Sequence, residues 1–400
     1  MAYCSRAATH AFLMKKSSPR TTSIRKPALH AAKRTARKSA RKTVATTAKK
    51  AAKKTAVQGP VTLTQARALA GGPPPDRAVV ATKAAVARMA TVRAVTAGPA
   101  TPETVAIERE RLQKQRDRED LERIKNYKAT MTLMQKRGVK GIAAAGTAAA
   151  AAGPLRILAE GDSWFDYPYP LFGGGIIKRL EDRLGLPILN LAQAGDEIRF
   201  MLGVEQRLKI ITRLKNGSPA GGAWDVMLFS GGGNDLVDNP MVLWLNRYQA
   251  GMSAAQLINQ PRYAHALALV RAAYEDLIAL RNALTPATRL VFHAYDYAIP
   301  DGRGACHLGP WLKPSLDVKG VPANSTLAKA VVKEMLRQFA LMLDGLANAH
   351  PDITFINGQG TLPHASSAWH NELHPEKAGF NKFADLFRAK LKALYPNRVP

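Results

Sequence analysis

Beyond residue 154, short apolar runs alternate with longer amphipathic stretches. The apolar runs are bounded by turn residues and predict buried strands at 156–162, 187–192, 225–230, 289–294 and 353–356. The amphipathic stretches predict helices near 173–185, 197–215, 253–284, 325–349 and 376–394. Strands separated by helices of this length form right-handed βαβ units. We therefore expect an α/β domain with a parallel sheet that is covered on both faces.

The pattern before residue 154 is different. Opposite charges recur at three- and four-residue spacing over 108–137, which favours a solvated helix, and Thr101 and Pro102 supply a start signal for it. Apolar positions in this stretch are too sparse for a coiled coil, so we expect a spacer helix. Residues 60–100 are rich in Ala and Val and interrupted by Gly and Pro. They predict a linker with one short helix at 77–95.

The net charge is distributed unevenly along the chain. Of the net charge of +28, residues 1–75 contribute 17 Lys and Arg with no Asp or Glu, whereas residues 154–400 hold 26 basic and 22 acidic residues. We expect three parts: a disordered basic tail and linker (1–100), a charged helix with an Ala/Gly hinge (101–153) and a globular domain (154–400).

The basic tail, residues 1–58, is built from Ala, Lys, Arg, Ser and Thr and resembles linker-histone tails and the alanine-lysine tails of some bacterial nucleoid proteins. Its charges favour non-specific, salt-sensitive binding to nucleic acid or to an anionic surface, because each contact with a phosphate releases counterions. A solubilising tail and an organelle transit peptide are the alternatives.

Several classes of protein are disfavoured. The two cysteines, Cys4 and Cys306, give neither a disulfide framework nor zinc spacing, and the histidines show no metal-ligand spacing. No apolar run is long enough for a transmembrane segment, and the N-terminus has no signal-peptide core. We expect a cytoplasmic protein with no metal and no cofactor.

Four blocks rich in glycine and polar residues lie just beyond predicted strand ends or in a C-terminal loop: Gly-Asp-Ser-Trp at 161–164, Asn-Leu-Ala-Gln-Ala-Gly-Asp at 190–196, Ser-Gly-Gly-Gly-Asn-Asp at 230–235 and Trp-His-Asn-Glu-Leu-His-Pro at 369–375. Ligands of parallel sheets bind beyond the carboxyl ends of the strands. Ser163 is the candidate nucleophile, and it needs a base and oxyanion donors nearby. The Gly-x-Ser-x-Gly elbow of α/β-hydrolases is absent.

Over residues 154–394, these blocks and their order resemble the SGNH (GDSL-type) hydrolases, a branch of serine esterases and lipases. The resemblance implies a three-layer α/β/α sandwich around a five-stranded parallel sheet. It also implies that Ser163 is the nucleophile and His374 the general base. The oxyanion hole would consist of the Ser163 and Gly195 backbone N–H groups and the Asn234 side chain.

The sequence departs from the family pattern at one position. The family usually has an aspartate three residues before the base histidine, and here that residue is Asn371. An amide carries no charge to stabilise an imidazolium and can hold the wrong tautomer, which costs serine proteases about 10⁴ in rate. The neighbouring Glu372 could replace the aspartate, or a backbone carbonyl could orient the ring of a Ser-His dyad.

The long, turn-rich stretch 295–321 is expected to wall a substrate pocket, since loops of this length are usually functional. The expected pocket residues are Asp162, Trp164 and Tyr295, with further aromatic residues Phe165, Tyr167 and Tyr169. The leading hypothesis is a serine esterase that acts on a small acyl, lipid or acetylated carbohydrate ester. The alternative is a polyanion-binding protein, for DNA or anionic lipid, whose hydrolase-like domain is weak or inactive.

Overall fold

The computed structural model describes residues 59–71, 102–140, 153–167, 174–305 and 308–399. The basic tail, the predicted helix at 77–95 and the Ala-rich stretch 141–152 lie outside the described residues.

A five-stranded parallel sheet forms the centre of the structure, with the strand order β2-β1-β3-β4-β5. Its strands are β1 (Ile157–Gly161), β2 (Ile188–Asn190), β3 (Val226–Ser230), β4 (Arg289–His293) and β5 (Ile353–Ile356). Each predicted strand is present within a few residues of its expected bounds. Nearly every position of these strands is buried, as expected for a sheet that is covered on both faces.

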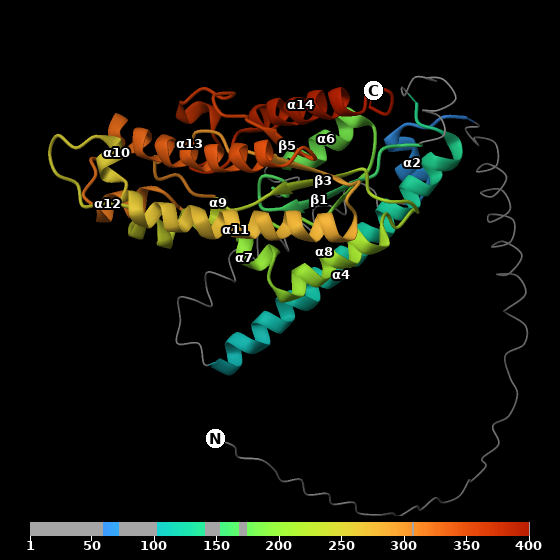
Figure 1. Ribbon diagram of the computed structural model, residues 1–400, viewed down its shortest axis with the longest axis horizontal. Coiled ribbons are helices and arrows are strands. Elements are labelled where there is room, and N and C mark those ends of the chain that lie inside the picture. Colours follow the sequence, from blue (N-terminus) through green and yellow to red (C-terminus); the bar gives the residue numbers. More distant parts are fainter. Residues whose placement is uncertain (1–58, 72–101, 141–152, 168–173, 306–307, 400) are drawn as a thin grey trace, which may run out of the picture. The chain divides into compact units, whose positions relative to one another are not determined.

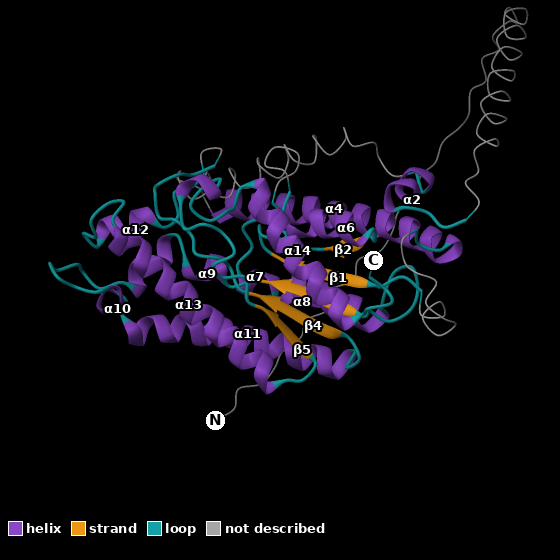
Figure 2. Ribbon diagram, turned by 90° about the horizontal axis from the view of Figure 1, so that it is seen from above, coloured by secondary structure: helices purple, strands orange, loops and turns teal. Residues whose placement is uncertain are grey.

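Helices cover both faces of the sheet (Figures 1 and 2). α6 (Ile176–Leu184) and α14 (Lys377–Leu394) pack together on one face. α8 (Val204–Asn216), α11 (Gln260–Leu284) and α13 (Thr326–Ala349) form the opposite layer. The chain therefore has the predicted three-layer α/β/α architecture.

Short helices occupy the connections. They are α7 (Ile198–Met201), α9 (Gly233–Leu236), α10 (Ala254–Leu257), α12 (Lys313–Val318) and the 3₁₀ turns η2 (Asn239–Trp244) and η3 (Ser366–Ala368). The helix predicted at 197–215 is divided at Leu202 and Gly203, and the one at 253–284 at Ile258 and Asn259.

The charged stretch forms one continuous helix, α4 (Pro102–Arg137), but the predicted spacer role is wrong. Tyr127, Thr130, Met131 and Met134 are buried, because they lie at helical spacing on the face that packs against the domain. Figure 1 shows α4 running along the α8 side of the molecule. The composition change at residue 154 is therefore not a packing boundary.

A second element was not predicted from the sequence. α2 (Leu63–Leu69) lies in the expected linker and packs against α4. A capping box starts it, in which Thr62 and Gln65 exchange hydrogen bonds between side chain and backbone. Val61 pairs with Val139 in an isolated parallel bridge, so α2 is fixed to the end of α4.

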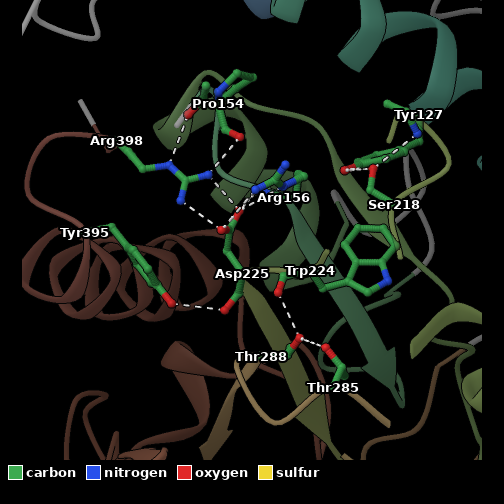
Figure 3. Close-up of polar contacts among 12 residues, drawn as sticks. Tyr127, Pro154, Arg156, Ser218, Trp224, Asp225, Thr285, Thr288, Tyr395 and Arg398 are labelled. Atoms are coloured by element: carbon green, nitrogen blue, oxygen red, sulfur yellow. Dashed lines mark hydrogen bonds and ion pairs between the residues drawn. The ribbon is translucent and has the colours of Figure 1, made fainter. Parts of the chain in front are cut away.

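The C-terminal residues close the amino end of the sheet (Figure 3). The Arg398 guanidinium binds both carboxylate oxygens of Asp225 at 2.8 and 2.7 Å and donates to the carbonyls of Gly153 and Pro154. The Tyr395 hydroxyl donates to the Asp225 carbonyl. These contacts join the end of the chain to the residues that precede β1 and β3, on the side of the sheet opposite the polar blocks.

Within the described residues, no helix is both long enough and apolar enough to cross a membrane.

Candidate active site

Ser163 lies in the tight turn that follows β1 at the carboxyl edge of the sheet. The backbone N–H groups of Phe165 and Asp166 both donate to the Asp162 carbonyl, which closes the turn. At Gly161 a Cβ atom would lie 2.5 Å from the Ser230 carbonyl oxygen, so only glycine allows β1 and β3 to approach so closely here. Ser163 is buried in this turn, with 5% of the residue exposed.

His374 reaches this serine from the loop before α14. Its Nε2 atom lies 2.6 Å from the Ser163 Oγ atom. The two residues are 211 positions apart in sequence, and the fold brings them to hydrogen-bond distance. This is the geometry that a serine nucleophile and its general base require.

Asn371 fixes the tautomer of His374. The Asn371 Oδ1 atom accepts the backbone N–H groups of Leu373 and His374, each at 2.9 Å. Since donors surround this atom, it must be the amide oxygen, and it can only accept the Nδ1–H of the His374 ring, also at 2.9 Å. Nε2 then carries the lone pair and faces the Ser163 hydroxyl. The wrong-tautomer problem that asparagine poses in serine proteases is avoided here.

Tyr167 supports the same arrangement. Its hydroxyl accepts the Asn371 Nδ2–H at 3.0 Å, and its ring stacks on the His374 imidazole with centroids 4.3 Å apart. Both the amide and the imidazole are therefore held by neighbours on more than one side.

The imidazole is neutral at ordinary pH. Burial, aided by the neighbouring His370, lowers the pKa of His374 from its usual 6.5 to about 3. Asn371 contributes no negative charge that would raise the pKa again. A neutral ring can accept a proton from Ser163 over a wide pH range.

Glu372 does not take the place of the missing aspartate. It is fully buried, and its carboxylate accepts four backbone N–H groups from the loop before and at the start of α12. The donors are Gly302, Trp311, Leu312 and Lys313. Burial raises the pKa of Glu372, while these hydrogen bonds act in the opposite direction. Its role is to fasten the 295–321 loop to the histidine block.

Two further predicted site residues lie on neighbouring loops. Gly195 has φ +89°, a conformation that favours glycine, in the loop after β2. The Asn234 amide donates to the Asp196 carbonyl at 2.8 Å, which orients the amide and leaves its second N–H for another acceptor. Within the described part of the chain, the backbone N–H groups of Ser163 and Gly195 have no acceptor.

Asp162 connects the Ser163 turn to the ends of β3 and β4. Its carboxylate accepts the Tyr295 hydroxyl at 2.5 Å, the Trp164 N–H at 3.0 Å and the Ser230 hydroxyl at 3.1 Å. Burial raises the pKa of Asp162 to about 6, although these hydrogen bonds oppose the shift. Ser230 Oγ also lies 2.8 Å from His293 Nε2, so His293 is a structural residue of the network.

A cavity of about 640 Å³, counting its open mouth, reaches the Ser163 and His374 side chains. The predicted pocket residues Asp162, Trp164 and Tyr295 line it, and so does Asn234. Gly195 is not part of the lining. The expected 295–321 stretch contributes Asp296, Ala298 and Leu312 to the lining as well as Tyr295. The rest of the wall is mainly aliphatic and aromatic and was not predicted; it includes Leu236, Val237, Met241, Val332, Met335, Leu336 and Phe339.

Three further aromatic residues were expected near the pocket. Phe165 and Tyr167 do not line the cavity: the Phe165 ring stacks on His293 and the Tyr167 ring on His374. Tyr169 lies outside the described residues. Among the described residues, no cluster of His, Cys, Asp and Glu could hold a metal ion.

Comparison with known proteins gives matches to solved structures. No protein-family model matches the sequence, and no curated protein matches it significantly. The extracellular lipase from Streptomyces rimosus is 16% identical with a TM-score of 0.38, and the match covers 59% of this chain and 99% of that chain. Phospholipase A1 from Streptomyces albidoflavus is 14% identical with a TM-score of 0.36, covering 60% of this chain and 100% of that chain. A carbohydrate esterase family 3 protein from Talaromyces cellulolyticus is 10% identical with a TM-score of 0.34, covering 61% and 99%.

Other matched structures are described as a putative GDSL-like lipase from Parabacteroides merdae and a putative SGNH hydrolase from Slackia heliotrinireducens. The sheet order, the two helical layers and the four blocks in order are the grounds on which the fold of this chain is SGNH hydrolase-like.

Proposed function

We propose that this protein is a serine esterase that hydrolyses carboxylic esters with an apolar acyl chain. His374 Nε2 takes the proton of the Ser163 hydroxyl as its oxygen attacks the ester carbonyl. The resulting imidazolium donates that proton to the alcohol oxygen as the ester bond breaks. A water molecule then attacks the acyl-serine, and His374 transfers a proton from the water to Ser163 as the acid leaves.

In this proposal, three N–H donors hold the oxyanion of each tetrahedral intermediate. The Asn234 amide lines the cavity and has one N–H directed away from its bond to Asp196. The Ser163 backbone N–H and, in the next loop, that of Gly195 are the other donors in the proposal. Removing one such donor costs about 10² to 10³ in turnover in other serine hydrolases.

The apolar lining of the cavity favours an acyl chain over a sugar as its occupant. A carbohydrate needs many hydrogen-bonding side chains, whereas the cavity wall formed by α13 and by residues near α9 is almost wholly apolar. Each buried CH₂ of an acyl chain gains about 0.8 kcal/mol. Preference should therefore rise with acyl length until the cavity is full.

The observation that carries the proposal is the 2.6 Å contact between Ser163 Oγ and His374 Nε2 at the end of an apolar cavity. The test is hydrolysis of p-nitrophenyl acetate, butyrate, octanoate and palmitate by the full chain. We expect kcat/KM to rise from acetate towards octanoate, and Ser163→Ala to abolish it. Equal activity of wild type and Ser163→Ala would contradict the proposal.

The basic tail supports a second, separate proposal, because residues 1–75 hold 17 Lys and Arg and no acid. We infer non-specific binding to a polyanion through residues 1–58. The full chain should be retained on DNA-cellulose at low salt and released by about 0.2 to 0.5 M NaCl. A chain without residues 1–58 should flow through. Equal retention of the two chains would contradict this role.

A further inference from the structure

Two arginines of α4 bind the loops that carry the proposed site. Arg116 and Arg123 lie two turns apart on the helix, on the face that meets the loop after β2. We propose that these two residues, here called the arginine clamp, are positioning residues. They hold the proposed oxyanion donors and the turn that carries Ser163 in fixed positions relative to each other. The inference rests on the proposed esterase function.

Arg116 acts on the loop that contains Gly195. Its guanidinium binds the Asp196 carboxylate through both terminal nitrogens, at 2.5 and 3.4 Å. The Asp196 side chain is 4% exposed, so the ion pair is largely shielded from water on the acidic side. A bidentate pair of this kind fixes the orientation of the carboxylate as well as its position.

Asp196 passes this constraint to Asn234. Its backbone carbonyl accepts the Asn234 amide at 2.8 Å, and its own N–H donates to the Gln193 carbonyl at 3.2 Å. The residue held by Arg116 therefore lies directly after Gly195 and also orients the side chain proposed as an oxyanion donor.

Arg123 joins the same loop to the nucleophile turn. One guanidinium nitrogen donates to the carbonyls of Asn190 and Ala192, at 3.0 and 2.8 Å. The other binds the carboxylate of Asp166, three residues after the nucleophile, at 2.9 Å. A single side chain thus links the β1 and β2 loops, whose relative position sets the distance between Ser163 and the oxyanion donors.

Turnover depends on how accurately the oxyanion donors are placed. Oxyanion donors act only when they lie 2.7–3.1 Å from the developing charge, and a misplacement of about 1 Å can cost 10²-fold in rate. An acyl chain in the apolar cavity makes no contact with the clamp, because neither arginine lines the cavity. Loss of the clamp should therefore lower kcat and leave KM nearly unchanged.

The test compares Arg116→Gln with Arg118→Gln in the full-length protein. Arg118 is an exposed arginine two residues away on the same helix, which makes it a matched control. With p-nitrophenyl butyrate, Arg116→Gln should lower kcat about tenfold or more, with KM within about twofold. Affinity for an alkylboronic acid, which forms a tetrahedral adduct on serine, should fall by a similar factor. Arg118→Gln should behave as wild type, and Arg116→Lys should recover part of the loss.

Hydrogen exchange gives a readout that does not depend on activity. Arg116→Gln should speed exchange of amides in the 190–197 peptide about tenfold, and Arg118→Gln should not. A folded Arg116→Gln variant with wild-type kcat, or with unchanged exchange in this peptide, would overturn the clamp. If wild type hydrolyses no ester, the proposed function fails, and the exchange comparison alone decides whether the clamp holds the loop.

Discussion

Replacing Asn371 with aspartate places a negative charge against the proposed catalytic base. In the natural protein the Asn371 oxygen accepts the Nδ1–H of His374 at 2.9 Å, and the pKa of His374 is lowered to about 3. An aspartate in the same position would keep that hydrogen bond. The backbone N–H groups of Leu373 and His374 would stabilise its carboxylate, and the Tyr167 hydroxyl can rotate its hydrogen to donate to it.

The size of the effect follows from the short separation. Two unit charges about 4 Å apart interact by about 4 kcal/mol at an effective dielectric constant of 20. Since one pKa unit corresponds to about 1.4 kcal/mol, the pKa of His374 should rise by about 3 units, towards about 6. If about half of this stabilisation is present in the transition state, kcat rises about 30-fold at pH 8.

The assay is the pH dependence of kcat/KM for p-nitrophenyl butyrate between pH 4 and 9. Wild type should show no loss of activity as the pH falls from 9 to 5, because the imidazole stays neutral. Asn371→Asp should be more active at pH 8 and lose half of that activity near pH 6. If Asn371→Asp has the same turnover as wild type and its activity falls at the same low pH, the assignment of His374 as the titrating base is refuted.

Three further predictions concern the cavity wall, the histidine loop and the closed end of the sheet. Leu336→Trp fills part of the cavity, so kcat/KM for p-nitrophenyl octanoate should fall about tenfold or more relative to acetate; an unchanged ratio would exclude this cavity as the acyl site. Glu372→Gln leaves two of four backbone N–H groups without an acceptor, so urea unfolding should show a loss of at least about 2 kcal/mol, while the acid limb of the pH profile stays in place. For Asp225, burial acts to raise the pKa, but hydrogen bonds from Arg398 and Arg156 outweigh it and lower the pKa below 3.8. The charged form therefore stabilises the fold above this range. Asp225→Asn should cost about 1 to 3 kcal/mol in the free energy of unfolding at pH 7 and at pH 5, and this difference should shrink only as the pH falls below about 3.8; a difference that is already lost at pH 5 would contradict the assignment.

The sheet could be predicted because strands buried on both faces read as continuous apolar runs. The helical stretches between them were also recognisable, apart from the breaks at Gly203 and Asn259. The helix α2 was missed although Thr62 and Gln65 form a capping box that the sequence displays. The packing of α4 was missed because its buried apolar residues, Tyr127, Met131 and Met134, occupy only the last turns of a highly charged helix.

In the candidate site, residues that lie in short, recognisable blocks could be predicted, whereas contacts between distant parts of the chain could not. Ser163 and His374 stand out in short blocks at expected strand ends and in the last loop. The function of Glu372 could not be read from its place beside Asn371, because its partners belong to a loop about 60 residues earlier in the chain. The α13 side of the cavity was also missed, since an amphipathic pattern shows which face of α13 is buried but not that part of this face borders an empty space.

The central claim is that Ser163 is a nucleophile activated by His374. Treatment of the full chain with a fluorophosphonate, followed by intact-mass and peptide analysis, tests it most directly. We expect one adduct per chain, on Ser163, no adduct in Ser163→Ala and a much slower reaction in His374→Gln. A folded wild-type protein that forms no adduct, or that reacts at the same rate without His374, would contradict the account.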